Sequence, residues 1–340
     1  MKYRTLGRSG AVVSTYSLGT MTFGAETPEP EAGRQLEAYA ESGGTVIEMA
    51  DVYAGGEAER IVGRWLSRRS DRDRSDLFLA SKGRFPVDVT PRDAGLSRRH
   101  LRRALEASLK RLGVEHIDLY QLHAWDPLTP LEESLGFLDD AVAQGKISYG
   151  GLSNFTGWQV AEAAAWARGR FPLVSMQPQY NLLVREVEWE IVPACISAGL
   201  GILPWSPLGG GWLSGKYRRD VAPVGSTRLG EDPHRGVEAY AGRNARETTW
   251  RVLDAVETIA DARGASMSQV SLAWLAAQPG VASVILGSRT AAQLTENLGA
   301  VDLELTPAEL GSLDDASAPV TADYPYGAPG IDQRSRPIID

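Results

Sequence analysis

Several residues able to move a proton stand at the ends of short apolar runs. The stretch VIEMADVYAGGEAE, residues 46–59, turns from an apolar run into a polar turn and carries Glu48 and Tyr53. The run LFLASK ends in Lys82, and the run IDLYQLH ends in His123. Each of these residues alone fits the ordinary polar end of a buried strand. Together, a carboxylate, a phenol, an ammonium and an imidazole on three successive run ends form a set that can transfer a proton.

The elements that must position this set are short apolar runs alternating with amphipathic helical patterns. In LRRALEASLKRL, for example, four leucines share one helical face, as core packing requires. Eight strands alternating with helices predict a closed parallel (β/α)8 barrel, whose chemistry lies at the C-terminal strand ends. A doubly wound sheet is less favoured, because SLGTMTFGAE lacks the G-x-G-x-x-G turn. The expected strands are YSLGT, TVIEMA, LFLASK, IDLYQLH, SYGGLSN, VSMQPQY, GILPWSP and SVILGS.

The chain outside these repeats predicts a hairpin and two irregular segments. YRTLGRSGAVVS reads as two strands around a Ser-Gly turn, which would close the bottom of the barrel. No linker divides the chain, so residues 1–340 are expected to form one barrel domain. Residues 218–243 and the tail 321–340 mix Pro, Gly and charge without periodicity. Both are expected near the active-site face, as lids or as disordered loops.

Composition excludes several classes of protein. The 340 residues carry a formal net charge of -8, which argues against a nucleic-acid partner. No run of eighteen apolar residues predicts a membrane span, and the N-terminus lacks a signal-peptide core. The single cysteine, Cys195, cannot form an internal disulfide, so a cytoplasmic location is expected. His100, His116 and His234 show no metal-ligand spacing, and no metal is expected.

Fragments along nearly the whole chain resemble the aldo-keto reductases, most closely the branch of the potassium-channel β-subunit and its bacterial relatives. The fragments are YRTLGRSG, LASK, HIDLYQLHAWD, GLSNF, MQPQYNLL, WSPLGGGWLSGKY and GSRTAAQLTENLGA, in this order. The resemblance implies a (β/α)8 barrel that binds NADP(H) in an extended pose without a Rossmann turn. It also implies a small-molecule carbonyl substrate.

The proton-transfer set suits reduction of a carbonyl group. A phenol has a pKa near ~10, and a nearby ammonium should lower it. Tyr53 would therefore donate the proton to the forming alkoxide, and Lys82 would tune its pKa. Glu48 would hold Lys82 charged, and His123 would bond the carbonyl oxygen and orient it.

Glu48 departs from the pattern of the family it resembles. The family has D-T-A-x-x-Y, whereas this chain has E-M-A-D-V-Y, with Glu48 and Met49 at the first two positions. Asp51 does not replace the missing aspartate, because an acidic residue is common at its position. The extra methylene adds roughly ~1.5 Å of reach, and catalytic geometry is sensitive on a scale of ~1 Å. Three outcomes are open: Glu48 folds back to pair with Lys82, the site is slowed, or the site is retuned for another reduction.

The resemblance also implies a set of cofactor-binding residues. Amides and hydroxyls near strands five and six would bond the nicotinamide carboxamide, and an indole on strand seven would stack on its ring. A loop after strand seven would cover the pyrophosphate. Arg289 with Ser288 would pair with a 2′-phosphate, which favours NADPH, although Gln293 stands where many relatives carry a basic residue. The implied residues are Ser153, Asn154, Gln177, Trp205, Ser206, Leu208, Gly210, Leu213, Lys216, Gly287, Ser288, Arg289, Gln293, Glu296 and Asn297.

Three functions remain open from the sequence. The first is an NADPH-dependent reductase of aldehydes or ketones. The second is a nucleotide-binding sensor or partner protein with little turnover. The third is a pathway-specific reductase of a keto-sugar or an enone, with Trp125, Trp212, Tyr324 and Tyr326 as candidate pocket walls. An NTPase is not favoured, because GGWLSGKY ends in Tyr217 where a phosphate-binding loop needs Ser or Thr. The substrate and the oligomeric state, including a possible homo-oligomer, are not determined.

Overall fold

The protein is built on one parallel sheet that curls into a barrel. The computed structural model describes residues 1–87 and 93–335. Eight strands run parallel in the order β10-β3-β4-β5-β6-β7-β8-β9, and they coincide with the eight runs expected from the sequence. They are β3 (Tyr16–Gly19), β4 (Val46–Glu48), β5 (Phe78–Gly83), β6 (Ile117–Leu122), β7 (Ile147–Ser153), β8 (Leu173–Gln177), β9 (Gly201–Ile202) and β10 (Val284–Gly287).

Backbone hydrogen bonds between the two outermost strands close the barrel. Ile202 at the end of β9 pairs with Val281, just before β10, in a parallel bridge. Ala282 N–H donates to the carbonyl of Ile202 at 2.9 Å, and Ile285 N–H donates to that of Pro204 at 3.1 Å. The predicted (β/α)8 barrel is confirmed, and closure brings the C-terminal ends of all eight strands to one rim.

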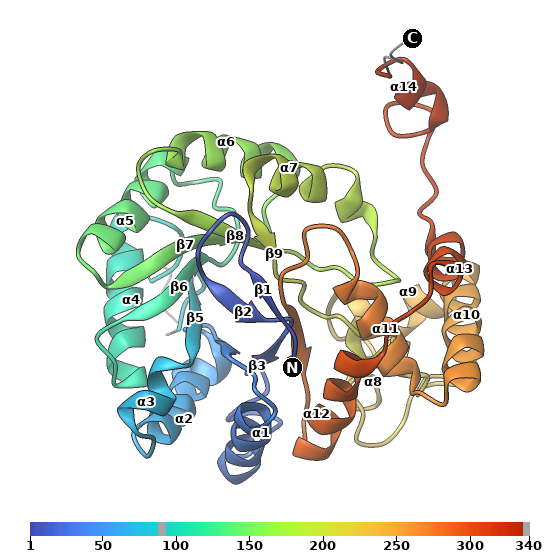
Figure 1. Cartoon of the computed structure of the whole chain (residues 1–340), viewed down its shortest axis with the longest axis horizontal. Helices are drawn as coiled ribbons and strands as arrows, with labels where there is room; N and C mark the ends of the chain where they lie inside the picture. Colours follow the sequence, from blue (N-terminus) through green and yellow to red (C-terminus); the bar gives the residue numbers. More distant parts are fainter. Residues whose placement is uncertain (88–92, 336–340) are drawn as a thin grey trace.

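Helices surround the barrel, and most of them bury one face (Figure 1). On α4 the four leucines of the predicted stripe are all buried against the sheet. The helix ends at Gly113, whose φ of 67° lies in the left-handed region that glycine adopts without strain. The barrel helices are α1 (Glu29–Glu41), α2 (Glu57–Leu66), α3 (Asp71–Ser75), α4 (Arg98–Leu112), α5 (Leu131–Ala143), α6 (Gly157–Ala167), α7 (Ile191–Ala198), α10 (Glu247–Arg263), α11 (Met267–Ala276), α12 (Ala291–Leu298) and α13 (Pro307–Ser317).

An N-terminal hairpin closes the other end of the barrel, as expected. Strands β1 (Tyr3–Thr5) and β2 (Val12–Ser14) pair antiparallel and lie across the barrel end that faces the viewer in Figure 1. Leu6 and Val13 of the hairpin are buried among apolar side chains that point into the barrel. Arg8 N–H donates to a carbonyl at the α7–β9 turn at 2.8 Å. The bottom of the barrel is therefore sealed, which leaves the C-terminal rim as the accessible end.

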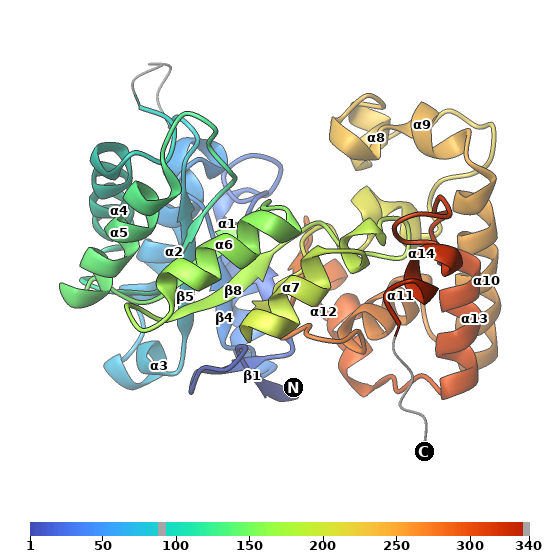
Figure 2. The same cartoon turned by 90° about the horizontal axis from the view of Figure 1, so that it is seen from above.

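The segment after β9 lies on the side of the barrel opposite the hairpin (Figure 2). Its residues 218–243 were expected to be irregular, but the structure shows short helical turns joined by loops there. Leu229 is buried and anchors the helical turn that contains it against the rest of the protein. The Leu229 N–H donates to the Tyr217 hydroxyl at 3.3 Å. The turns are η3 (Gly209–Ser214), α8 (Arg228–Glu231), η4 (Gly236–Glu238) and α9 (Tyr240–Asn244).

The described part of the C-terminal tail lies at the edge of the barrel. It contains α14 (Ala328–Asp332), and Tyr326 stacks on Trp189 with 5.4 Å between ring centroids. The Tyr326 hydroxyl donates to Glu190, directly before α7, at 2.6 Å. Residues 336–340 of the predicted tail segment lie outside the described residues. None of the helices in the described part of the chain combines the length and apolar character needed to cross a membrane.

Candidate active site

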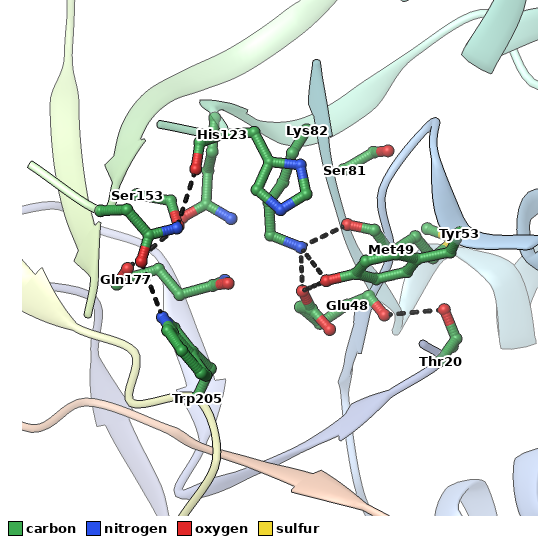
Figure 3. Close-up of polar contacts among 12 residues, drawn as sticks. Thr20, Glu48, Met49, Tyr53, Ser81, Lys82, His123, Ser153, Gln177 and Trp205 are labelled. Atoms are coloured by element: carbon green, nitrogen blue, oxygen red, sulfur yellow. Dashed lines mark hydrogen bonds and ion pairs between the residues drawn. The ribbon is translucent and has the colours of Figure 1, made fainter. Parts of the chain in front are cut away.

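The four residues of the proton-transfer set meet at the C-terminal rim (Figure 3). Glu48 is the last residue of β4, and Tyr53 begins η1 (Tyr53–Gly56) five residues beyond it. Lys82 lies near the end of β5, and His123 directly follows β6. Because β4, β5 and β6 are adjacent in register, side chains from three distant parts of the sequence point into one space.

Lys82 is the centre of this group and is completely buried. Its ammonium forms an ion pair with the Glu48 carboxylate. It also donates to the Tyr53 hydroxyl at 2.9 Å and to the Met49 carbonyl at 2.8 Å. Three acceptors match the three donors of an ammonium, so its position is fixed.

The pKa of Tyr53 in this group shifts in a direction that the sequence did not predict. Burial, followed by repulsion from Glu48, raises the pKa of Tyr53 well above its usual value of 10. Burial lowers the pKa of Lys82, and the Glu48 carboxylate opposes that decrease. The pKa of Tyr53 therefore lies above that of a free phenol, contrary to the expectation of a lowered value, because burial and the neighbouring Glu48 carboxylate both disfavour the phenolate. Tyr53 is a neutral phenol throughout the neutral pH range.

His123 faces Tyr53 from the next strand. The two ring centroids lie 6.0 Å apart at an interplanar angle of 80°, and Phe85 packs edge-on against His123 at 4.8 Å. Burial, then the charges of Lys82 and Arg84, lower the pKa of His123 to about 2. Its Nδ1 has no hydrogen-bond partner among the described residues. The imidazole is therefore neutral and keeps an unpaired ring nitrogen.

Glu48 reaches the phenol as well as the ammonium. The Tyr53 hydroxyl donates to Glu48 Oε1 at 3.3 Å, so one carboxylate oxygen contacts both partners. A Cβ atom at Gly19 would lie 2.7 Å from the Ile285 side chain but 3.4 Å from Glu48 Oε2, an ordinary contact distance, so this glycine accommodates Ile285 and not the longer carboxylate side chain. Of the alternatives raised by the departure from aspartate, the structure shows pairing with Lys82.

A second group of polar side chains lies beside the first, on the next strand ends. The Asn154 amide donates to the His123 carbonyl at 3.0 Å and accepts from Trp205 Nε1 at 3.0 Å. Ser153 Oγ donates to the Gln177 carbonyl at 3.0 Å. These contacts place the Trp205 indole and the Gln177 amide next to the proton-transfer set (Figure 3).

Features of this group fit a bound nicotinamide ring. Buried Gln177 Nε2 has no hydrogen-bond partner among the described residues, and a carboxamide oxygen would satisfy it. Asn154 has φ 55° and Ser206 has φ 54°, a region that non-glycine residues seldom adopt and that clusters at ligand sites. Donors, acceptors and an aromatic face are thus present where the resemblance implied a cofactor.

The loop expected to cover a pyrophosphate is only partly free to do so. Gly210 N–H donates to Ser206 Oγ at 3.2 Å, and Leu213 is buried with its N–H bonded to the Leu208 carbonyl at 3.2 Å. Leu213 is therefore a core residue with no free backbone donor. By contrast, the Lys216 ammonium lies 6.0 Å from the centre of the Tyr217 ring and makes no hydrogen bond or ion pair with any residue that the structure describes. Burial and the charge of Arg289 lower the pKa of Lys216.

The residues expected at the adenosine end follow β10 and begin α12. Ser288 is buried and donates to Gln35 at 2.7 Å, so its hydroxyl is already engaged. Gln293 accepts from Arg289 N–H at 3.0 Å. Gly287, Gln293 and Glu296 are exposed, whereas Asn297 is buried.

Several charged residues near the site were not found from the sequence. Buried Glu238 accepts from the Gln179 amide and from Ser206 Oγ, the latter at 3.3 Å. Arg228 Nε is buried without a partner among residues 1–87 and 93–335. Both lie in the segment 218–243, whose lack of periodicity hid which side chains would turn inward.

Two further buried carboxyl groups, those of Glu59 and Asp51, lie behind Lys82. Glu59 accepts from Ser81 at 2.6 Å and from Arg111 at 2.6 Å. Asp51 is fully buried, and neither of its carboxyl oxygens has a partner within the described residues. Burial and repulsion from Glu59 raise the pKa of Asp51 from 3.8 to about 7.

The four aromatic residues proposed as pocket walls have different environments. Trp212 is 0% exposed and stacks on Tyr240, so it belongs to the core and cannot line a pocket. Trp125 is partly buried and packs edge-on against Trp158 at the outer rim, with 5.4 Å between centroids. Tyr324 is exposed, and Tyr326 contacts Trp189 as described above. No cluster of three or more His, Cys, Asp and Glu able to hold a metal ion occurs in the part of the chain that the structure describes.

Comparison with known proteins agrees with this architecture. The model of the aldo/keto reductase family matches residues 16–318. A probable voltage-gated potassium channel subunit beta from Arabidopsis thaliana is 36% identical over 322 residues, covering 92% of this chain and 96% of the relative. The uncharacterized oxidoreductase YrpG of Bacillus subtilis is 35% identical over 328 residues, 93% of this chain and 95% of its own length. The versiconal hemiacetal acetate reductase of Aspergillus parasiticus is 32% identical over 344 residues, 94% and 98% of the two chains.

The chain belongs to the aldo/keto reductase family. It is similar over nearly its whole length both to oxidoreductases and to potassium-channel β-subunits. Members of this family generally use nicotinamide cofactors.

Proposed function

We propose that the protein reduces an aldehyde or ketone to an alcohol with NADPH, and that Tyr53 donates the proton. The observation that carries this proposal is the contact of the buried Lys82 ammonium with the Tyr53 hydroxyl at 2.9 Å, next to His123. A bound nicotinamide cofactor supplies the hydride in such a reaction. The chain itself must supply a proton, orient the carbonyl and stabilise the charge that develops on its oxygen.

Tyr53 suits the role of proton donor because its raised pKa keeps the phenol protonated at neutral pH. Lys82 stabilises the phenolate that remains after transfer, through the hydrogen bond that it already makes. His123 has a pKa of about 2, so it acts as a neutral donor or acceptor toward the carbonyl oxygen and not as an acid. Glu48 keeps the Lys82 ammonium charged within a dry site.

In this proposal the site has two ends. Glu48, Tyr53, Lys82 and His123 form the reacting end, and a second group of residues forms the end that holds the cofactor. Ser153, Asn154 and Gln177 would hold the nicotinamide carboxamide, with Trp205 against its ring. Lys216 and the residues after β10 would hold the phosphates and the adenosine. The unpaired Gln177 amide and the unpaired Lys216 ammonium support this assignment.

A second candidate function is a nucleotide-binding partner protein with little turnover. It is favoured by the similarity to plant potassium-channel β-subunits and by the Glu48–Tyr53 contact, which turns the phenol hydrogen away from a substrate. Such a protein would bind NADPH and show negligible turnover.

The test follows NADPH oxidation with a panel of aldehydes, ketones, keto-sugars and enones, using the wild type and Tyr53→Phe. Turnover in the wild type and its loss by a factor of about 10² or more in Tyr53→Phe would support the reductase. NADPH binding without turnover would favour the partner protein. A folded protein that does not bind NADPH would contradict both functions.

A further inference from the structure

We propose that Glu231 lowers the preference for NADPH over NADH by occupying the arginine side chain that would otherwise bind a 2′-phosphate. This inference rests on the proposed function, because it concerns the adenosine end of the same cofactor site. It assigns a specificity-determining role to a residue of α8, far in sequence from β10.

Arg289 and Glu231 form a bidentate ion pair, in which two guanidinium nitrogens contact the two carboxylate oxygens. Arg289 Nη1 donates to Glu231 Oε1 at 2.8 Å, and Nη2 donates to Glu231 Oε2 at 2.7 Å. Nη1 also donates to the Ser226 carbonyl at 3.3 Å. A guanidinium binds a phosphate through the same pair of parallel N–H groups. The carboxylate therefore fills the position that a 2′-phosphate needs.

The carboxylate is held there by its helical turn. The N–H of Gly230 is capped by Thr227 Oγ1 at 3.0 Å, and neighbouring Leu229 is fully buried. A Cβ at Gly230 would meet the Val224 backbone at 2.7 Å, so the chain approaches itself closely at this point. Glu231 thus reaches Arg289 from an anchored turn and not from a freely moving loop.

Apart from Lys216, whose pKa the charge of Arg289 lowers and which is assigned to the pyrophosphate, the groups near Arg289 do not restore the lost positive charge. The Ser288 hydroxyl is turned toward Gln35, and Gln293 is uncharged. Arg235 is paired with Glu26 at 2.5 Å. A 2′-phosphate must therefore displace Glu231, whereas the 2′-hydroxyl of NADH has no such requirement.

The expected effect is moderate, because the ion pair is partly exposed to water. The side chains of Arg289 and Glu231 are 22% and 45% exposed. Exposed pairs of this kind contribute little, so removing the carboxylate should improve the preference for the 2′-phosphate by about fivefold.

The experiment measures dissociation constants of NADPH and NADH, and of the fragments 2′,5′-ADP and 5′-AMP, for the wild type and Glu231→Gln. Arg289→Met and the double variant complete a thermodynamic cycle. Glu247→Gln is the matched control, since Glu247 forms a similar two-oxygen contact with exposed Arg219 outside the proposed site. Circular dichroism checks that each variant is folded.

The inference is supported if Glu231→Gln strengthens binding of NADPH and 2′,5′-ADP about fivefold, leaves NADH and 5′-AMP unchanged, and has no effect in the Arg289→Met background. An equal change for both dinucleotides overturns it, because Glu231 would then only hold the segment closed. No change in Glu231→Gln, or the same change in Glu247→Gln, also overturns it. If a folded wild type binds neither dinucleotide, the proposed function fails together with this inference.

Discussion

The two ends of the site are built from different kinds of ion pair. At the reacting end, the side chains of Lys82 and Glu48 are 0% and 4% exposed and come from adjacent strands of the barrel. At the adenosine end, Arg289 pairs with Glu231 at the surface, across a helical turn outside the barrel.

The difference has an energetic consequence. A buried charge that loses its partner cannot be solvated by water, whereas an exposed one can. The reacting end is thus rigid and intolerant of change. At the proposed adenosine end, we expect that a single surface substitution can change the cofactor preference while the chemistry stays fixed.

The largest effect is expected from Lys82→Met, which tests the buried end directly. It leaves the Glu48 carboxylate unpaired and removes the donor that holds Tyr53. We expect turnover to fall by a factor of about 10²–10⁴ and the free energy of unfolding to fall by about 3–5 kcal/mol. Urea unfolding and NADPH oxidation would measure the two effects. The double variant Lys82→Met/Glu48→Gln should recover stability but not turnover, and a single variant of unchanged stability would contradict the buried ion pair.

Asp51→Asn tests a buried carboxyl behind the same end. A pKa raised from 3.8 to about 7 means that the folded state holds a proton that the unfolded state has released. Stability is therefore lost as pH rises from about 4 to about 7, by up to about 4 kcal/mol. We expect Asp51→Asn to raise the melting temperature at pH 8 and to change it little at pH 4. Equal effects at both pH values would show that Asp51 is ionised in the folded protein.

Glu48→Asp tests whether the longer carboxylate side chain limits turnover at the reacting end. The shorter side chain should keep its contact with Lys82 and lose the 3.3 Å hydrogen bond from Tyr53. Freeing the phenol hydrogen for the substrate should raise kcat by about fivefold, the value of one hydrogen bond. Steady-state kinetics decide the outcome. A slower variant would mean instead that the site depends on the longer carboxylate.

The smallest effect is expected at the rim, from Tyr326→Phe. This change removes the hydrogen bond to Glu190 and keeps the stacking on Trp189. Because the bond lies at the surface, away from Lys82, turnover and melting temperature should stay unchanged within error. A clear fall in kcat with full stability would show that the tail acts on the reacting end.

The fold was predictable because hydrophobic periodicity reports it locally. All eight strand runs and the N-terminal hairpin appear in the structure where the sequence indicated them. The meeting of Glu48, Tyr53, Lys82 and His123 was also predictable, since parallel strands that end in polar residues must bring those ends to one rim.

Other features could not be predicted, because they depend on contacts between distant segments. The pKa of Tyr53 rises because of burial and the Glu48 carboxylate, and sequence distance does not report burial. Leu213 and Trp212 are core residues, although their loop resembled a binding loop. Glu231 and Glu238 were missed, because an aperiodic segment gives no sign of which side faces inward.

Local sequence patterns are enough to set the order of elements, the barrel and the chemical types gathered at its rim. Contacts made on folding set which of those groups are charged, which are already paired, and which remain open to a ligand. The physical reason is that strand and helix patterns arise from neighbours within a few residues, whereas desolvation and ion pairing arise from atoms that only folding brings within a few ångströms.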